Sequence, residues 1–219
     1  GSFQVLMLPE EDSIRVKAKT NVADDYMEFT TPQMLKRFSF WAYFLWSILF
    51  SAIGLGLVGQ VSTISSFIGF SEMNASYMVS MVALFNGIGR FFFGNIFDSK
   101  GRKLTMNIIS VMTIVGTCIL AIAVKGGSAW FLIVSFVFMG LAFGGVTPTN
   151  SNFIRTFYGI TNYPMNFSLV NFNLLISVFI GQYIGSTLYM TTGGYFISAL
   201  AMMMLAVLGT ICNLLIKRP

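Results

Sequence analysis

Histidine is absent from the 219-residue sequence, cysteine occurs only twice, and charged residues make up only 10% of the chain. Both cysteines, Cys118 and Cys212, lie inside apolar runs. The residues needed for the usual His/Cys metal sites, for histidine acid–base chemistry and for a disulfide framework are therefore missing. We predict no metal site and no cofactor. Because a soluble globular domain has about 25% charged residues, this composition excludes an ordinary soluble domain.

Hydrophobic residues are abundant instead, at 55% of the chain, and the mean hydropathy is +0.76. A helix needs about 20 apolar residues to cross the roughly 30 Å of hydrocarbon in a bilayer. Six segments qualify, at about residues 38–67, 75–97, 104–124, 130 onward (fading through 144–148), 165–190 and 194–216. The runs are continuous, whereas a membrane barrel would show short alternating strands. We therefore predict an all-α membrane protein, a bundle of six transmembrane helices.

Polar residues gather before the first apolar run. Residues 1–37 hold six of the eight acids and five of the thirteen bases. We expect residues 3–37 to form a solvated cytoplasmic arm, followed by the transmembrane bundle at 38–219. Gly1 and Ser2 are typical of the scar that an expression vector leaves, and they are excluded from the interpretation.

The basic residues are distributed unevenly over the two sides of the predicted bundle. Eleven of the thirteen lie in the arm, in two connections (98–103 and 152–163) and in the tail, all of which fall on one side. The opposite side has only Lys125, and Arg90 falls inside a span. The positive-inside rule therefore predicts that both ends of the chain are cytoplasmic, in a plasma or bacterial inner membrane by default. The net charge of +5 then reflects orientation in the bilayer and does not imply a nucleic-acid partner.

Motifs typical of nucleotide enzymes are missing. Residues 87–90, Gly-Ile-Gly-Arg, lack the third glycine of a dinucleotide-binding loop and lie within an apolar run rather than after a strand. The sequence has no Gly-rich loop ending in Lys-Ser/Thr, so ATP is not implied as an energy source. The sequence therefore disfavours an enzyme.

The most specific motif is GNIFDSKGRK, which begins at Gly94 and has the form G-x3-D-x2-G-R-K. We expect Gly94 to permit close helix approach and Asp98 to end the second span. Gly101 would let the chain reverse before Arg102 and Lys103 meet the lipid headgroups. Asp98 can accept hydrogen bonds from N–H groups at a neighbouring helix terminus or from Arg102. A basic loop that only fixes topology is the alternative.

This order of residues resembles the signature loop of the major facilitator superfamily of transporters, which lies between helices 2 and 3, is repeated between helices 8 and 9, and acts as a cytoplasmic gating latch. In that superfamily two six-helix halves hold the substrate near mid-membrane. SAIGLGLVGQ (51–60), LFNGIGRFFFG (84–94) and RTFYGITNYPMNFSL (155–169) resemble helix 7, helix 8 and the 10–11 loop of the oxalate/formate antiporter group and related monocarboxylate carriers. The resemblance covers residues 33–219. It implies that the bundle corresponds to helices 7–12 and that the N-terminal six-helix half is its partner.

Arg90 is the one base inside a predicted span. It lies eight residues before Asp98, or about 12 Å along a helix at 1.5 Å per residue, and no predicted span contains an acid. A lone cation at membrane depth is costly and favours a water-filled cavity beside an anion. The resemblance implies the same role, because an Arg at this place in helix 8 binds the substrate carboxylate in both carboxylate-carrying groups. An Arg held by helix carbonyls, or by an acid in the missing half, is the alternative.

Two positions depart from the family's patterns. Monocarboxylate carriers place an Asp four residues before the helix-8 Arg, where it takes the coupled proton, whereas this chain has Asn86, an amide that cannot titrate. The dicarboxylate-carrying antiporters have a second base in helix 11, whereas the fifth predicted span has no Lys or Arg. A monocarboxylate is therefore expected rather than oxalate, unless the missing half supplies the second cation.

Polar side chains also mark the fifth and first predicted spans. Asn166, Asn173 and Ser177 are spaced seven and four residues apart, which places them on one helical face. Polar groups are expensive in lipid, so this face should line the substrate cavity or bond to another helix. Gln60, after several glycines in the first span, has the same two interpretations. Residues 144–148 form either a bend that moves during gating or the frayed end of the fourth span.

Together these features predict the C-terminal half of a secondary active transporter that moves a small organic anion, with a monocarboxylate as the expected substrate, by alternating access. Arg90 would bind the carboxylate in a cavity lined by Asn86, Gln60, Asn173 and Ser177. One alternative is a proton-linked monocarboxylate symporter whose titratable acid lies in the missing half. An alternative of another class is a non-transporting membrane sensor or scaffold with a carrier fold.

Overall fold

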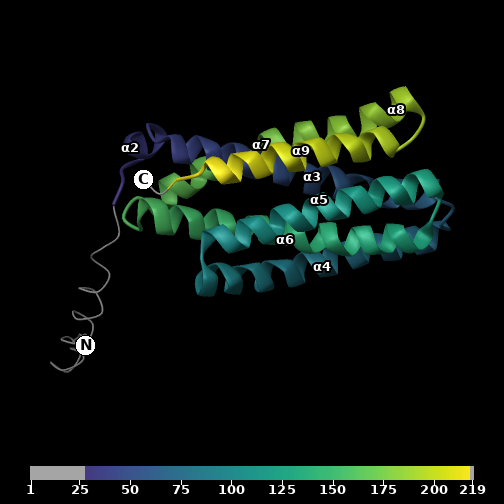
Figure 1. Cartoon of the computed structure of the whole chain (residues 1–219), viewed down its shortest axis with the longest axis horizontal. Helices are drawn as coiled ribbons and strands as arrows, with labels where there is room; N and C mark the ends of the chain where they lie inside the picture. Colours follow the sequence, from purple (N-terminus) through teal and green to yellow (C-terminus); the bar gives the residue numbers. More distant parts are fainter. Residues whose placement is uncertain (1–27, 218–219) are drawn as a thin grey trace, which may run out of the picture.

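The computed structural model describes residues 28–217, which form a bundle of long helices (Figure 1). In chain order the elements are α2 (Thr31–Leu35), α3 (Phe38–Phe67), α4 (Glu72–Lys100), α5 (Arg102–Gly126), α6 (Ala129–Tyr158), α7 (Tyr163–Gln182), the π turn η1 (Tyr183–Thr187), α8 (Leu188–Thr192) and α9 (Phe196–Leu215). Within this part of the chain, α3, α4, α5, α6, the continuous segment Tyr163–Thr192 and α9 are each long and apolar enough to cross a bilayer. The prediction of an all-α, multi-pass membrane protein with six spans is confirmed.

The fourth span differs from its prediction. Pro148 lies inside α6, which continues through Gly144 and Gly145 to Tyr158 without ending. Proline has no N–H to give to the helical ladder, but the hydroxyl of Thr149 donates to the carbonyl of Gly145 at 2.7 Å and so provides a local side-chain bond beside it. The expected frayed end near residue 148 is therefore wrong. Much of the predicted 152–163 loop is helical, so Arg155 lies in the last turn of α6.

Helices α3 and α6 form the centre of the bundle. Helix α6 packs against α4 on one side and α5 on another, while α3 packs against α7 and α9, and α5 and α9 contact each other. Helix α4 is the least covered span, with 17% of the residues in its most apolar window buried, compared with 72% for α3. The segment formed by α7, η1 and α8 follows at 28%. Helices α4 and α7 therefore present the largest uncovered surfaces.

The described basic residues separate along the bundle axis as the charge distribution predicted. The end where α2, the α4–α5 turn, the α6–α7 turn and the end of α9 meet (Figure 1) carries Lys36, Arg37, Lys100, Arg102, Lys103, Arg155 and Lys217. We call it the basic end. The opposite end carries Lys125, in the last turn of α5. This separation is what the positive-inside rule requires, and cytoplasmic placement of the basic end stays a prediction.

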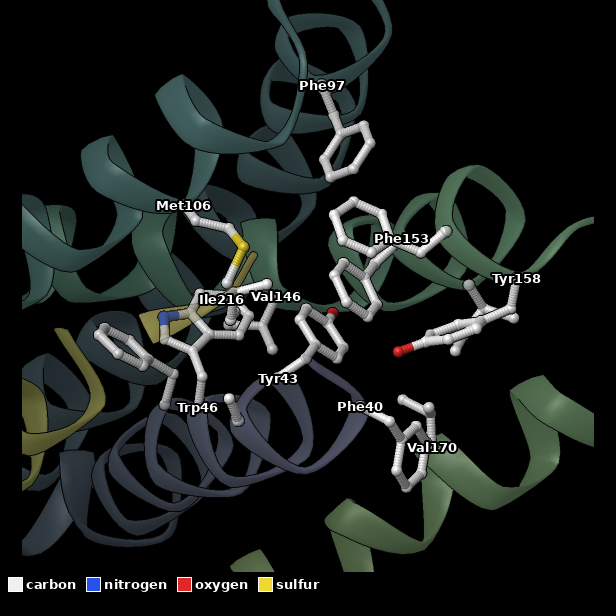
Figure 2. Close-up of a cluster of buried hydrophobic side chains, with 14 of the residues drawn as sticks. Phe40, Tyr43, Trp46, Phe97, Met106, Val146, Phe153, Tyr158, Val170 and Ile216 are labelled. Carbon is white, nitrogen blue, oxygen red and sulfur yellow. The ribbon is translucent and has the colours of Figure 1, made fainter. Parts of the chain in front are cut away.

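An aromatic core holds the basic end together (Figure 2). Tyr43 of α3 stacks on Phe153 of α6 with ring centroids 3.6 Å apart, and the hydroxyls of Ser39 and Tyr158 are hydrogen-bonded at 3.0 Å. Phe97, near the end of α4, belongs to the same buried cluster. The core therefore ties the turn after α4 to α3 and α6.

The last ten residues of the arm pack onto this end of the bundle. Met34 of α2 is completely buried, Phe29 is 8% exposed, and the backbone N–H of Phe29 donates to the carbonyl of Tyr158 at 3.1 Å. The expectation of a solvated arm is therefore wrong for Phe29 and Met34, which pack on the bundle, whereas Lys36 and Arg37 are exposed as expected. Residues 1–27 lie outside the described chain.

Glu28 fastens the arm to the connection between α6 and α7. Its carboxylate accepts hydrogen bonds from the backbone N–H groups of Ile160 (3.1 Å) and Thr161 (3.0 Å). Desolvation by itself would raise the pKa of this carboxyl, but the two backbone hydrogen bonds outweigh it and lower the pKa below its ordinary value.

The lowered pKa of Glu28 predicts a pH-dependent contribution to stability. Because the folded-state pKa lies below the unfolded value, the stabilisation is fully present above the unfolded value near 4.5 and is lost as pH falls through the folded value. We expect Glu28→Gln to lower the melting temperature of the detergent-solubilised protein near neutral pH, with the difference from wild type shrinking toward zero in acid. A difference that stays constant from pH 7 to pH 3 would contradict this linkage.

Candidate functional site

Arg90 lies on the least covered helix, within the span. It is ten residues before the end of α4 and 18 after its beginning, or about 15 Å and 27 Å at 1.5 Å per residue. Its side chain is exposed, and its Nε donates to Oδ1 of Asn86, one turn earlier, at 3.2 Å. The three acids of residues 28–217, at positions 28, 72 and 98, lie outside the spans or near the ends of α4. The structure therefore brings Arg90 and Asn86 together on an open face and pairs Arg90 with no carboxylate of the described chain.

Backbone contact with α6 fixes the position of this pair. A Cβ on Gly144 would overlap the carbonyl oxygen of Asn86 and lie 3.0 Å from the backbone N of Arg90. A Cβ on Gly89 would likewise overlap the carbonyl oxygen of Leu141. The two helices thus touch through main-chain atoms, so the Asn86–Arg90 turn has little freedom to shift. This contact was not predicted from the sequence, although Gly140 and Gly144 have the small-xxx-small spacing that is typical of helix packing in membranes.

Gly94, in contrast, is not a close-approach position in this bundle. A Cβ built there would meet its nearest neighbour, Cβ of Pro148, at 3.7 Å, an ordinary van der Waals distance. The expectation that Gly94 permits close helix contact is therefore wrong for the packing within this chain. That role belongs to Gly89 and Gly144.

The turn after α4 has the predicted shape but different partners. Gly101 has φ +78°, a conformation that favours glycine, and this one residue separates α4 from α5. Asp98 accepts a hydrogen bond from Nδ2 of Asn152 on α6 at 3.1 Å, so neither a helix terminus nor Arg102 is its partner. The expected Asp98–Arg102 bond is absent from the part of the chain that the structure describes. Lys103 is exposed at the basic end.

Arg102 reaches across to the end of α9 instead. Its Nη1 donates to Oδ1 of Asn213 at 3.1 Å, its Nη2 donates to the carbonyl of Ile216 at 3.2 Å, and its guanidinium lies 5.7 Å from the ring centroid of Phe157. A cation at the C-terminal end of a helix is favourable, because it meets unpaired carbonyl groups. The signature turn is thus joined to α9 through Arg102 and to α6 through Asp98.

The fifth span has the predicted polar face, but that face is buried against α3 and the arm. Asn166, Asn173 and Ser177 are all fully buried. Nδ2 of Asn173 donates to Oγ of Ser47, the hydroxyl of Ser177 donates to the carbonyl of Ile48 at 2.8 Å, and Asn166 bonds to the arm through Phe29 and Thr31. The placement of Asn173 and Ser177 in an open cavity is therefore wrong for this structure. Their side chains bond α7 to α3, which is the alternative that the sequence left open.

Gln60 has a similar helix-joining position. Its Nε2 donates to Oγ of Ser186 in η1 at 2.9 Å, and its Oε1 accepts from the hydroxyls of Thr63 (2.9 Å) and Tyr195 (3.1 Å). These bonds join α3 to η1 and to Tyr195, but Gln60 is only half-buried, and its place in the cavity lining stays a prediction. The π turn at Ser186 was not predicted, because the hydrophobic pattern of the span runs through it without interruption.

Thr147 is an exposed polar side chain that the sequence analysis did not select. It lies three residues after Gly144 on α6, within one turn of the backbone contact with Asn86 and Arg90. A polar residue directly before a proline inside an apolar run was the available signal. Arg90 and Thr147 are thus exposed, and Asn86 is half-buried beside Arg90.

Comparisons with known proteins agree with this architecture. The family model described as Major Facilitator Superfamily matches residues 29–219, and the chain belongs to that superfamily of membrane transporters. The chain is also similar to a protein described as "Oxalate:formate antiporter" from Oxalobacter formigenes, with 30% identity over 151 residues. That match covers 67% of this chain and 36% of the relative, so the chain spans about a third of the relative's length.

Proposed function

We propose that this chain is the C-terminal six-helix half of a secondary transporter that moves a small organic anion, and that a monocarboxylate is its substrate. The observation that carries the proposal is the position of Arg90: an exposed cation, well inside a membrane span, with an amide as its side-chain partner. Such a charge is expensive in hydrocarbon and is stabilised by water and an anion. A guanidinium also matches the planar geometry of a carboxylate, which it can bind through two parallel N–H···O bonds.

The comparisons support the choice of anion. The relative from Oxalobacter formigenes is described as exchanging oxalate and formate, both of which are carboxylates. In this chain the described fifth span offers no second base opposite Arg90, which favours a substrate with one negative charge. Asn86 has no titratable proton, so it orients the guanidinium through its Oδ1 but does not couple transport to protons. Exchange or facilitated transport is the mode that fits these residues.

The mechanism follows from the contacts at the basic end and on α4. The N-terminal half would cover the open faces of α4 and α7, with the substrate held between the halves beside Arg90, Asn86 and Thr147. The turn that contains Gly94, Asp98, Gly101, Arg102 and Lys103 would act as the cytoplasmic latch. Through Asp98 and Arg102 this turn bonds to Asn152 of α6 and Asn213 of α9. These bonds would make α4, α5, α6 and α9 move together as one rigid unit when the two halves rock against each other.

The substrate class is tested by counterflow in proteoliposomes that contain the intact carrier, with its N-terminal six helices present. Labelled monocarboxylates, dicarboxylates and a neutral analogue of similar size are compared at a fixed internal concentration. We expect saturable exchange of a monocarboxylate and none of the neutral analogue. Absence of flux for every carboxylate would overturn the proposal in favour of another substrate class or of a scaffold. Flux that follows an imposed proton gradient would favour the proton-linked symporter.

A further inference from the structure

An open cleft of about 980 Å³ lies at the basic end, among the α4–α5 turn, the end of α6 and the end of α9. Among residues 28–217, four cations line it: Lys100, Arg102, Lys103 and Lys217. The one acid in the described lining, Asp98, is hydrogen-bonded to the amide of Asn152. The cleft thus has a surplus of positive charge, which favours an anionic ligand.

The inner part of the cleft is ordered by side-chain hydrogen bonds. Nδ2 of Asn213 donates to Oδ1 of Asn107 at 2.7 Å, while Oδ1 of Asn213 accepts from Arg102 at 3.1 Å. Arg102 uses its remaining contacts on the carbonyl of Ile216 and on the sulfur of Met106. A guanidinium has five N–H groups, and two of those of Arg102 have no acceptor among residues 28–217. Arg102 is thus held in place in the lining of the cleft and has N–H groups left for a further acceptor.

The cleft lies where several spans end, and the ends of spans are where lipid headgroups are expected. Helix α4 ends at Lys100, α5 begins at Arg102 and α9 ends at Leu215, so three membrane-spanning helices terminate around it. The α5 N-terminus adds the partial positive charge of its unpaired N–H groups. Directly beside it, α5 and α9 expose apolar side chains on the spans themselves: Leu104 (45% exposed), Ile211 (49%) and Leu214 (71%).

From this juxtaposition of a cationic cleft with an apolar outer surface, the geometry points to a binding site for an anionic phospholipid. The phosphate accepts from Arg102 and pairs with Lys103 and Lys217, and the acyl chains lie along α5 and α9. A free phosphate would contact only the cations of the cleft, whereas a phospholipid contacts the cations with its phosphate and the apolar outer surface with its acyl chains. The bound lipid bridges the signature turn to α9, so it stabilises the end of the bundle where the latch lies. This site is separate from Arg90 and does not depend on the transported substrate.

The test is lipid retention by the intact carrier, measured by native mass spectrometry after reconstitution with phosphatidylglycerol or phosphatidylcholine. The variant is Lys103→Gln/Lys217→Gln, and the matched control is Lys36→Gln/Arg155→Gln, which removes the same charge at the same end but outside the cleft lining. With about 1 kcal/mol for each surface Lys, we expect the variant to retain at least about 10-fold less phosphatidylglycerol than the control. Equal retention in the two double variants would overturn the site.

A second arm distinguishes a lipid from a free anion. Phosphatidylglycerol should raise the melting temperature of wild-type carrier and of the control, and should raise that of the Lys103→Gln/Lys217→Gln variant much less. Inorganic phosphate and glycerol phosphate at millimolar concentration should not reproduce the shift. If they reproduce it fully, the acyl chains contribute nothing and the phospholipid assignment is wrong.

Discussion

Replacing Arg90 with Gln should severely weaken saturable carboxylate exchange by the intact carrier. The amide keeps much of the side chain's length and can still bond to Asn86, but it lacks the charge that the substrate carboxylate needs at membrane depth. Removing one partner of a desolvated, hydrogen-bonded charge pair costs about 2–5 kcal/mol, which corresponds to a loss of at least about 30-fold in substrate affinity at 1.4 kcal/mol per factor of ten. Proteoliposome uptake at several substrate concentrations measures this loss.

A second substitution at Arg90 separates the effect of the charge from that of the guanidinium geometry, and a substitution at Arg155 is the control. Arg90→Lys keeps the charge and loses the bidentate fork, so it should retain weak exchange with a raised half-saturation concentration. Arg155→Gln removes an exposed Arg at the basic end, in the last turn of α6, and should exchange normally. Equal exchange by wild type and Arg90→Gln would remove Arg90 from the substrate site.

Adding one methyl group at Gly144 should destabilise the bundle. In Gly144→Ala the new Cβ would overlap the carbonyl oxygen of Asn86, and both that oxygen and the nearby N of Arg90 belong to the backbone of α4. A rotamer change cannot relieve this overlap, so α4 must move away from α6. Overpacking of this kind costs about 1–3 kcal/mol and occasionally more. We expect a lower melting temperature and a lower yield of folded protein in detergent.

The matched control for this prediction is Gly94→Ala. It adds the same methyl group to the same pair of helices, where the nearest atom is Cβ of Pro148 at 3.7 Å. Its melting temperature should stay close to that of wild type. If Gly144→Ala melts no lower than Gly94→Ala, backbone contact does not position the Asn86–Arg90 turn.

The six spans were predictable because membrane insertion depends on local composition. A run of about 20 apolar residues is sufficient to specify a spanning helix, whatever its neighbours are. The continuation of α6 through Pro148 was not predictable in this way, since proline usually ends or kinks a helix. Helix α6 is nevertheless unbroken there, and packing against neighbouring helices can hold a proline-containing helix in a membrane protein together. These are tertiary effects that the local pattern does not contain.

Spacing predicted which polar residues share a face but not what covers that face. The shared face of Asn166, Asn173 and Ser177 follows from helical geometry. Whether it faces a cavity or another helix depends on how α7 sits on α3, and the close packing of Gly56 and Gly181 backbones decides this. The same reasoning applies to Arg102, whose partners lie more than a hundred residues away on α9. Arg90 could be identified from the sequence because a charged residue inside an apolar run stands out, whatever the helix packs against.

Ligand binding to the purified intact carrier reports on the Arg90–carboxylate contact by itself, because it is measured without transport. The transported monocarboxylate should raise the melting temperature of wild type progressively with concentration, as expected for a ligand that binds the folded state. The Arg90→Gln variant should melt at the wild-type temperature without ligand and show no shift at concentrations that saturate wild type. An equal ligand-induced shift in both proteins would show that the carboxylate is held elsewhere and that Arg90 is not its binding residue.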